Sequence, residues 1–283
     1  MSQIIYFNGS YINKDEAKIS IGDRGYIFGD GIYEVFLVKN GKLIDFDAHI
    51  ERFVRSMKIM NFQLRELANL REITMELLKL NNKNDALMYL QISRGDCGVR
   101  EHTMPLVENP TFFMMAGSER VHKKEWTEGG IKCNLESDTR WQRRDVKTLN
   151  LLGNIMAKQK SAHLGFDDAI FVDGGIVTEA TSSNVLIVDA DGTLKTHPAT
   201  NKILDGITKN RTLEIAKSLG IKTKECAFTP EDMISASEIF LTSSGYKIRG
   251  VSQVDGHKIG NGVVGKTTKL LSEKMEEFIA NHS

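Results

Sequence analysis

Tight-turn signals divide this chain into short strands. Asn-Gly and Asp-Gly pairs tolerate the left-handed backbone of a two-residue β-turn, and such pairs stand here between β-prone segments. They occur at Asn8-Gly9, Asn40-Gly41, Asp173-Gly174-Gly175 and Asp191-Gly192. Each predicts an antiparallel hairpin, so the first and the second half of the chain must both contain a sheet.

Helical patterns alternate with these hairpins. Apolar residues recur at helical spacing over 48–60. They form one stripe of Ile50, Phe53, Val54 and Met57. Further helices are predicted over 65–80, 149–164, 208–219 and 267–280 and from Thr229-Pro230 onward, and further strands over 86–94, 111–117 and 238–243. Mixed strands and helices of this kind are typical of an α+β protein.

A charged segment without clear periodicity follows residue 117 and is the best candidate for a linker. We therefore expect an N-terminal domain over 1–120, a linker over 121–128 and a C-terminal domain over 129–283. With 283 residues, 41% of them hydrophobic and 26% charged, the chain is long enough for two medium-sized cores. The interpretation is a two-domain protein with a cleft between its domains.

The formal net charge of +0 gives no reason to expect nucleic acid or an anionic membrane as a partner. The cysteines, Cys97, Cys133 and Cys226, show neither Cys-x-x-Cys spacing nor a disulfide framework, which indicates a reducing compartment. The N-terminus lacks a signal-peptide pattern, and no apolar run approaches the ~18 residues that span a bilayer. We expect a cytoplasmic protein that holds no metal.

Lys147 stands between Val146 and an apolar-rich run, where an amine is poorly solvated. Such an amine loses its proton more readily and becomes nucleophilic. Glu179 follows in the run Val-Thr-Glu-Ala-Thr-Ser-Ser-Asn at 177–184. A lysine that forms a Schiff base and an acid that protonates a pyridine nitrogen are what pyridoxal phosphate requires of a protein. Taken alone, Lys147 would be an ordinary surface lysine.

Asp-Val-Lys-Thr-Leu-Asn at 145–150, followed by Thr-Glu-Ala-Thr-Ser-Ser-Asn at 178–184, resembles the fold-type IV pyridoxal-phosphate enzymes. These are the branched-chain aminotransferases, the D-amino-acid aminotransferases and the aminodeoxychorismate lyases. The resemblance covers nearly the whole chain and is closest to the D-amino-acid aminotransferases. It implies a smaller N-terminal α/β domain, a larger C-terminal domain with a mixed, barrel-like sheet and helices, and pyridoxal 5′-phosphate at the domain interface.

The resemblance also implies how the cofactor is held, with Lys147 as the catalytic lysine. The cofactor-binding residues would be Lys147, Glu179, Arg52, Leu204, Ile207, Thr208 and Ser244. Gly206-Ile207-Thr208 opens a predicted helix, whose first amides suit an anion, so Ile207 and Thr208 match phosphate positions together with Ser244. Leu204 matches the apolar residue under the cofactor ring, although alone it would be a core leucine.

The role assigned to Arg52 depends most strongly on the resemblance. It lies on the helix face opposite the apolar stripe and, by pattern alone, would be a solvated arginine. The run His49-Ile50-Glu51-Arg52 matches the family's phosphate-arginine motif. The interpretation is therefore a phosphate ligand that faces the interdomain cleft.

Arg100 and His102 decide between substrates. Alternate residues of an extended segment point the same way, so both can present donors to one carboxylate. By composition alone the run would be an exposed charged loop. It resembles the substrate-carboxylate site of the D-amino-acid aminotransferases, which reaches into the neighbouring subunit and which the branched-chain enzymes lack. The resemblance thus implies a homodimer with shared active sites, in which the phenol of Tyr33 lies near the reacting centre.

These expectations describe a ping-pong transaminase that moves the amino group of a D-amino acid, of the D-alanine or D-glutamate type, to a 2-oxo acid. The alternatives are an L-branched-chain aminotransferase, an aminodeoxychorismate lyase, an (R)-amine transaminase and a binding module that keeps only the fold. The run Gly-Tyr-Lys-Ile-Arg at 245–249 departs from the family's small hydroxyl residues and proline. Lys247 or Arg249 would favour acidic substrates if either faced the site, but we expect both to be solvated.

Overall fold

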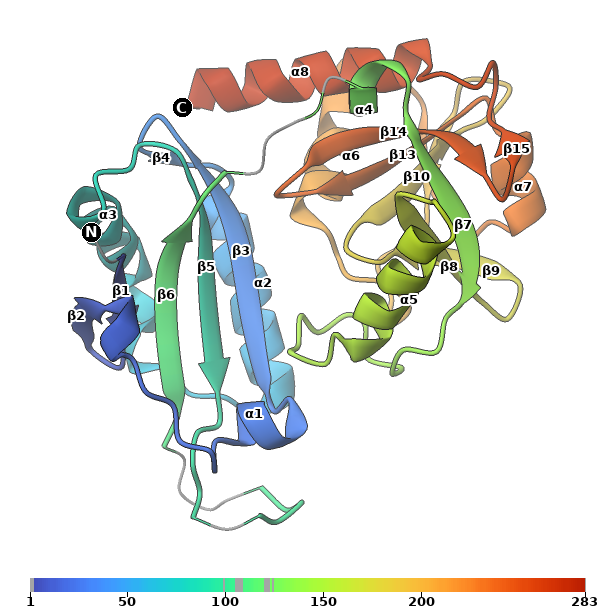
Figure 1. Ribbon diagram of the computed structural model, residues 1–283. Helices are drawn as coiled ribbons and strands as arrows, with labels where there is room; N and C mark the ends of the chain where they lie inside the picture. The colour runs from blue at the N-terminus through green and yellow to red at the C-terminus, as the bar shows by residue number, and fades with distance from the viewer. Residues whose placement is uncertain (1–2, 99, 105–108, 120–122, 124, 283) are drawn as a thin grey trace. The chain divides into compact units, whose positions relative to one another are not determined.

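The computed structural model describes residues 3–98, 100–104, 109–119, 123 and 125–282. The chain divides into two compact units (Figure 1). The first comprises Met1–Arg120, Val146–Asn150 and His282–Ser283, and the second comprises Val121–Asp145 and Leu151–Asn281. The predicted linker lies partly outside the described residues, and its last part, Glu125–Glu128, forms helix α4.

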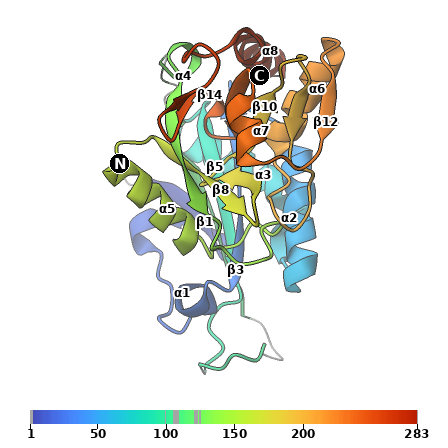
Figure 2. The same ribbon diagram turned by 90° about the vertical axis from the view of Figure 1, so that its right-hand side faces the viewer.

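The first unit contains a six-stranded antiparallel sheet in the order β2-β1-β6-β5-β3-β4. Its strands are β1 (Ile4–Phe7), β2 (Ser10–Asn13), β3 (Gly31–Lys39), β4 (Lys42–Leu43), β5 (Ala86–Ser93) and β6 (Thr111–Gly117). Its helices are α1 (Arg24–Phe28), α2 (Phe46–Met60) and α3 (Leu70–Leu80), with 3-10 turns η1 (Lys14–Glu16) and η2 (Arg65–Asn69). Helices α2 and α3 cover one face of the sheet (Figures 1 and 2).

The predicted hairpins of this unit are confirmed. Asn8 and Gly9 both have positive φ, 44° and 92°, as the two-residue turn requires. Strands β3, β5 and β6 bury apolar side chains under α2 and α3. The core includes Phe36, Phe53, Leu77, Met88 and Met114.

The predicted helix face of α2 is partly wrong. The helix buries Phe46, His49, Arg52, Phe53, Ser56 and Met57, whereas Ile50 and Val54 are only half-buried. Arg52 is therefore not solvated. Polar side chains that have partners inside the unit lie on the buried face, and a pattern of apolar residues cannot reveal them.

The second unit contains a nine-stranded mixed sheet. Its strands are β7 (Ile131–Ser137), β8 (Asp168–Asp173), β9 (Ile176–Ala180), β10 (Asn184–Val188), β11 (Leu194–Thr196), β12 (Thr223–Glu225), β13 (Glu238–Ser243), β14 (Lys247–Val254) and β15 (His257–Lys258). Besides α4, its helices are α5 (Leu152–His163), α6 (Ile207–Ser218), α7 (Pro230–Ser235) and α8 (Lys266–His282). The sheet follows the order β10-β13-β14-β7-β8-β9, and β9 pairs again with β10.

This last pairing closes six strands into a ring, which confirms the predicted barrel-like domain of an α+β protein. The pair that closes the ring is Glu179 on β9 and Asn184 on β10. Ring closure therefore fixes the backbone of Glu179. Apolar side chains such as Ile170, Val185, Leu241 and Val251 form the core of this unit.

The segment 146–150 departs from its predicted place in the C-terminal domain. It groups with the first unit because its backbone bonds to β3: Ile32 forms a bridge with Thr148, and the Leu149 amide donates to the Gly31 carbonyl (3.0 Å). For the same reason the predicted helix over 149–164 begins only at Leu152. The other predicted hairpins and helices of this unit are confirmed. Strands β7, β12, β14 and β15 were not predicted.

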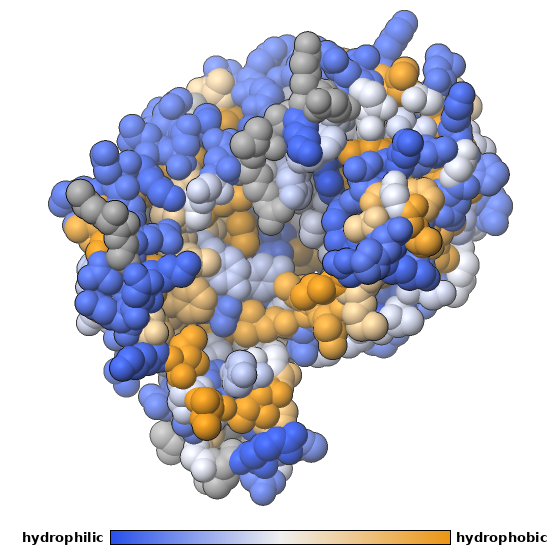
Figure 3. All heavy atoms as spheres, in the orientation of Figure 1, coloured by the Kyte–Doolittle hydropathy of each residue, from blue (hydrophilic) through white to orange (hydrophobic). Residues whose placement is uncertain are grey.

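The face drawn in Figure 3 is mostly hydrophilic, with separate apolar areas. Among the described residues, strongly exposed apolar side chains include Ile21, Leu152 and Met156. None of the helices in the described part of the chain combines the length and apolar character needed to cross a bilayer.

Candidate active site

Strand β3 holds Lys147. The Tyr33 amide donates to the Lys147 carbonyl (3.0 Å), and the Lys147 amide lies 3.5 Å from the Ser56 hydroxyl. The Lys147 amine, Nζ, lies 3.3 Å from the Tyr33 hydroxyl and 4.3 Å from the centre of its ring. The lysine and the phenol, which were predicted separately, are thus brought together in the first unit.

The Tyr33 ring is itself supported from the side. It stacks on Tyr89, with ring centres 5.5 Å apart and an angle of 23° between the planes, and Tyr89 stacks on Phe113 at 5.7 Å. Stacked rings restrict each other's rotation. The phenol beside Lys147 is therefore held at a fixed place on the sheet.

Arg52 forms a two-pronged ion pair with Glu34 on β3, with Nε–Oε2 and Nη2–Oε1 distances of 2.9 and 2.6 Å. His49 Nδ1 lies 3.1 Å from the same carboxylate. Burial would raise the pKa of Glu34, but Arg52 and His49 outweigh it and hold that pKa well below its usual range. Glu34 therefore fixes Arg52. Sequence reasoning missed Glu34, whose signal is a lone glutamate inside an otherwise apolar strand.

Arg100 and His102 are exposed. Both contact Phe28 at the end of α1: the Arg100 guanidinium carbon lies 5.1 Å from the ring centre, and the His102 ring meets it edge-on at 5.6 Å. The structure thus brings the two predicted carboxylate donors together around one aromatic ring.

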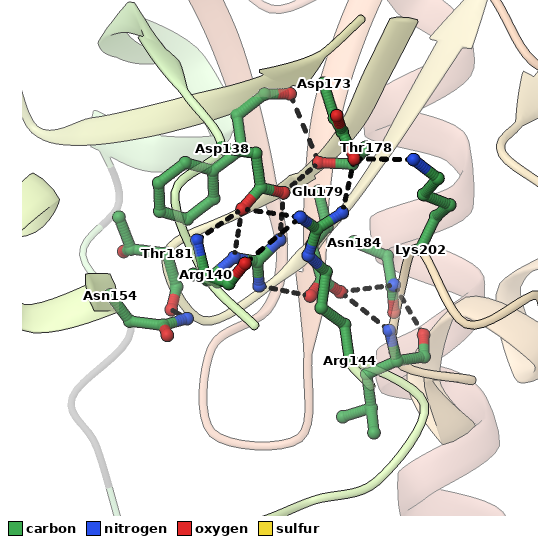
Figure 4. Close-up of polar contacts among 12 residues, drawn as sticks. Asp138, Arg140, Arg144, Asn154, Asp173, Thr178, Glu179, Thr181, Asn184 and Lys202 are labelled. Carbon is green, nitrogen blue, oxygen red and sulfur yellow. Dashed lines mark hydrogen bonds and ion pairs between the residues drawn. The ribbon is translucent and has the colours of Figure 1, made fainter. Parts of the chain in front are cut away.

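In the second unit, Glu179 is buried, and both of its oxygens are occupied (Figure 4). Arg140 Nη1 lies 2.5 Å from Oε1. The Leu204 amide donates to Oε2 at 3.0 Å, and Asn184 Nδ2 lies 3.4 Å from the same atom. Burial raises the pKa of Glu179, and Arg140 and the Leu204 amide offset this only in part. Glu179 is therefore a rigidly held acid whose pKa lies above that of an exposed glutamate.

Glu179 stands at one end of a row of alternating charges (Figure 4). Asp138 accepts Nε and Nη2 of Arg140, at 2.9 and 2.7 Å, and lies 3.3 Å from Arg144. Arg144 and Lys202 in turn bind Asp173, at 3.0 and 2.6 Å. Sequence reasoning missed this row, although the charged run at 138–145 was a signal for it.

Helix α6 begins beside Glu179. Gly206, its N-cap, leaves no room for a side chain, because a Cβ there would stand 1.8 Å from Asn184 Oδ1. Asn184 Nδ2 also donates to the Leu204 carbonyl at 2.8 Å. One asparagine thus joins Glu179, Leu204 and the start of α6. The first amides of α6, from Ile207 and Thr208 onward, have no helical acceptor.

Strand β13, which contacts α6, ends in Thr242 and Ser243, and Ser244 lies in the turn that follows. The hydroxyls of Thr242 and Ser243 are buried and have no hydrogen-bond partner among the described residues. Unpartnered buried hydroxyls are costly unless a ligand satisfies them, and phosphate oxygens would do so. Hydroxyl donors and the acid Glu179 in the second unit, and the amine of Lys147 in the first, are the kinds of group that pyridoxal 5′-phosphate requires. Ser243 was not predicted.

The predicted solvation of Lys247 and Arg249 is wrong. Arg249 is buried, with Nη2 2.8 Å from Asp168 Oδ2, and its guanidinium carbon lies 4.5 Å from the centre of the Tyr246 ring. Lys247 Nζ lies 2.9 Å from Glu276 Oε2. Because a carboxylate of this chain already pairs with each cation, the structure gives no support to their binding an acidic substrate.

Two relatives match this chain over nearly its whole length. D-alanine aminotransferase of Staphylococcus haemolyticus is 37% identical over 280 residues, which cover 99% of each chain. The protein of the same name from Bacillus licheniformis is 35% identical over 280 residues, covering 99% of this chain and 98% of its own.

Solved structures show the same fold. The Escherichia coli branched-chain amino acid aminotransferase matches with a TM-score of 0.94 and 24% identity, covering 100% of this chain and 96% of its own. A hypothetical aminotransferase from Mycobacterium tuberculosis in its PLP-bound form matches with a TM-score of 0.86 and 21% identity, over 99% and 100%.

The family match and the relatives named D-alanine aminotransferase define a pyridoxal-phosphate-dependent transaminase. The model of the amino-transferase class IV family matches residues 31–254, and the chain belongs to that family.

Proposed function

We propose that this protein transfers the amino group of a D-amino acid, of the D-alanine or D-glutamate type, to a 2-oxo acid. The observation that carries the chemistry is the placement of the Lys147 amine 3.3 Å from the Tyr33 hydroxyl on β3. The full-length relatives named D-alanine aminotransferase support the choice of a D-amino acid.

Pyridoxal 5′-phosphate, when bound, supplies an electron sink for the substrate's Cα. In this proposal the Lys147 amine would hold the cofactor covalently. Once released, the same amine would be the base that takes the Cα proton and the acid that delivers it to the carbon that carried the cofactor's aldehyde. The neighbouring phenol of Tyr33 orients that amine. Glu179, with its raised pKa, shares a proton with the ring nitrogen.

The remaining contacts hold the cofactor's phosphate and ring. Arg52, oriented by its ion pair with Glu34, would contribute guanidinium N–H donors rather than net charge, and the amides of Ile207 and Thr208 at the start of α6 would contribute further donors. Ser244 and the unpartnered hydroxyl of Ser243 complete the phosphate site. The side chain of Leu204, whose amide binds Glu179, would pack against the ring.

Arg100 and His102, which we call the carboxylate site, bind the carboxylate of the substrate. Arginine binds a carboxylate through two parallel hydrogen bonds, which fixes its orientation as well as its place. A fixed carboxylate determines which enantiomer presents its Cα hydrogen to Lys147. The carboxylate site is therefore the proposed source of D selectivity.

The proposal includes a homodimer in which the carboxylate site serves the neighbouring subunit. Large apolar side chains are exposed on both sides of this site along the chain: Ile21 (86%) and Tyr26 (79%) before it, and Met104 (57%) after it. A second copy would cover them. Light scattering should give twice the chain mass, and a monomer would refute the shared site.

We also propose a cytoplasmic location, since Cys97, Cys133 and Cys226 are free thiols.

A donor panel tests the function. Purified protein loaded with pyridoxal 5′-phosphate is given D- and L-alanine, glutamate and leucine, with pyruvate or 2-oxoglutarate as acceptor. We expect turnover of D-alanine and D-glutamate and little of their L forms. Turnover of L-leucine instead would indicate a branched-chain enzyme, and pyruvate release from aminodeoxychorismate without an acceptor would indicate a lyase. Lys147→Ala should abolish turnover; a near-wild-type rate would refute the chemistry.

A further inference from the structure

The carboxylate site consists of two long side chains on an exposed loop. Such side chains lose rotational freedom when they bind a ligand, which weakens binding unless the protein restricts them beforehand. The side chains of Arg100 and His102 both contact helix α1, which can restrict them.

Phe28, the last residue of α1, is the first of these contacts. It is half-buried, and its ring is shared by three side chains. Arg100 lies over it at 5.1 Å, His102 meets it edge-on at 5.6 Å, and Arg24 lies over it at 4.9 Å. Cations are attracted to the face of an aromatic ring, so Phe28 favours the rotamers that keep Arg100 and His102 together.

Arg24, the first residue of α1, holds the backbone of the same loop. Its Nη1 donates to the carbonyl of Glu101, between the two donors, and lies 3.5 Å from the carbonyl of Thr103. Its Nε binds Asp30 at 2.8 Å. A single buried guanidinium therefore joins α1, the start of β3 and the loop of the carboxylate site.

Asp30 is in turn held by a second arginine that is buried in the first unit. Arg94, which is fully buried (0% exposed), binds it through Nε and Nη2 at 2.9 and 3.1 Å and donates to the carbonyl of Met60 at 2.8 Å. Asp23, the N-cap of α1, accepts from Ser93 at 2.8 Å. Helix α1 is thus fixed to the sheet at both ends and can serve as a rigid base for the loop.

We propose that Phe28 and Arg24 are positioning residues of the carboxylate site. Phe28 preorganises the two donor side chains, and Arg24 preorganises the backbone between them. This inference rests on the proposed function and deepens it, because it assigns to α1 the affinity for the carboxylate group that all donors and acceptors share. Lys147 and the phosphate site take no part in it.

The test compares Phe28→Leu with Phe28→Tyr, which keeps the ring. Phe28→Leu should raise KM for D-alanine and for 2-oxoglutarate about three- to tenfold, because the ring contacts that hold Arg100 and His102 are lost together with the contact to Arg24. Its kcat should stay within about twofold of wild type, since the carboxylate is bound equally in the ground and transition states. Phe28→Tyr should restore the wild-type KM.

Inhibition by an unreactive carboxylate distinguishes a loss of carboxylate binding from a general disturbance of the fold. Propionate, a carboxylate that cannot react, should inhibit Phe28→Leu about three- to tenfold more weakly than wild type, while retention of the cofactor, followed by its absorbance, should be unchanged. Phe278→Leu is the matched control, because Phe278 is also half-buried beneath an arginine, with Arg211 at 4.2 Å, on helix α8. It should leave the KM values and propionate inhibition as in wild type.

Arg24→Lys tests the second positioning residue independently. Lysine keeps the positive charge but cannot bind Asp30 and the loop carbonyls at the same time. It should raise the same KM values and weaken propionate inhibition. If wild type transaminates D-alanine but neither Phe28→Leu nor Arg24→Lys changes KM or propionate inhibition, the inference is wrong. A fall in kcat with unchanged KM would also overturn it, because that result indicates a structural role. Wild-type protein without D-amino-acid turnover would refute the proposed function itself, and the inference with it.

Discussion

Buried pairs of opposite charge occur around the candidate site, in Glu34–Arg52, Asp30–Arg94 and Glu179–Arg140. An isolated buried charge is costly, and the loss of one partner leaves the other uncompensated. Each pair therefore holds a functional side chain in place and also makes the fold depend on that pair. This dependence can be measured residue by residue.

Replacement of Arg140 tests the pair with Glu179. Arg140→Met leaves the buried carboxylates of Asp138 and Glu179 without their shared cation, and we expect it to lower the free energy of unfolding of the second unit by about 3 kcal/mol. Trp126 and Trp141 are the only tryptophans, and both belong to this unit, so tryptophan fluorescence during urea unfolding reports on it.

Arg143→Met is the control for this measurement. Arg143 is 46% exposed and binds the partly exposed Asp145, so its loss should cost less than about 1 kcal/mol. Equal effects of the two replacements would show that the Arg140 pair does not stabilise the unit.

Asp30 predicts how stability depends on pH. Burial would raise the pKa of Asp30, but its bonds to Arg94 and Arg24 lower it below the unfolded value of about 3.9. The unfolded state then binds more protons near pH 4, so the stability that Asp30 contributes is present above that value and is lost as the pH falls through the folded pKa.

We therefore expect the melting temperature of wild type, followed by circular dichroism, to fall between about pH 5 and pH 2. Asp30→Asn should melt lower at pH 7, by the equivalent of about 3 kcal/mol, and should lose less over the acid range. A variant with the same acid slope as wild type would contradict the assignment.

Among the secondary-structure elements, β3 holds the largest number of the residues assigned to the candidate site. It supplies Tyr33 and Glu34, and it binds the segment that contains Lys147. The Asn40-Gly41 turn and the apolar residues around it predicted this strand. The pairing with 146–150 could not be predicted, because that segment is distant in sequence and has no strand pattern of its own.

The same limit explains the other errors. Asn-Gly and Asp-Gly turns and helix starts such as Thr229-Pro230 depend on neighbouring residues, and they were predicted correctly. The inward orientation of Arg52 depends on Glu34, and the pairing of Arg249 depends on Asp168, far away in the sequence. Periodicity within one segment contains no information about such partners.

The loop that leads to the carboxylate site gives a prediction at this scale. Gly95 has φ +79°, and a Cβ there would lie 1.6 Å from the Asn109 carbonyl oxygen. Gly95→Ala must therefore displace the backbone, and we expect it to lower the melting temperature by well over the equivalent of 2 kcal/mol and to raise KM for D-alanine. Gly98 is the matched control, because it has φ +76° but no non-neighbouring atom of the described residues within 4 Å of a Cβ placed there.

Gly98→Ala should cost only the strain of the left-handed backbone, about 1 kcal/mol. Differential scanning fluorimetry of both variants, with KM measured in parallel, gives the comparison. Equal losses for the two variants would mean that the close approach to Asn109 is not a constraint.

For the whole molecule, the sequence motifs predicted the two-domain α+β fold, the barrel-like sheet and the family, and these are confirmed. The sequence motifs also named Lys147, Tyr33, Glu179 and Leu204, which the structure brings together in two groups, one in each unit. The supporting residues Arg24, Phe28, Glu34 and Arg140 were missed, since each is defined by a tertiary partner. The position of the cofactor at the domain interface stays a prediction.

The central claim is that Lys147, and no other lysine, is the covalent attachment point of pyridoxal 5′-phosphate. Borohydride reduction of the loaded protein fixes the cofactor to the amine that holds it, and peptide mapping by mass spectrometry then locates the label. We predict a single pyridoxyl group, on the peptide that contains Lys147, and no stoichiometric label in Lys147→Ala. A label on a different lysine, or none after reduction of the yellow protein, would contradict the account.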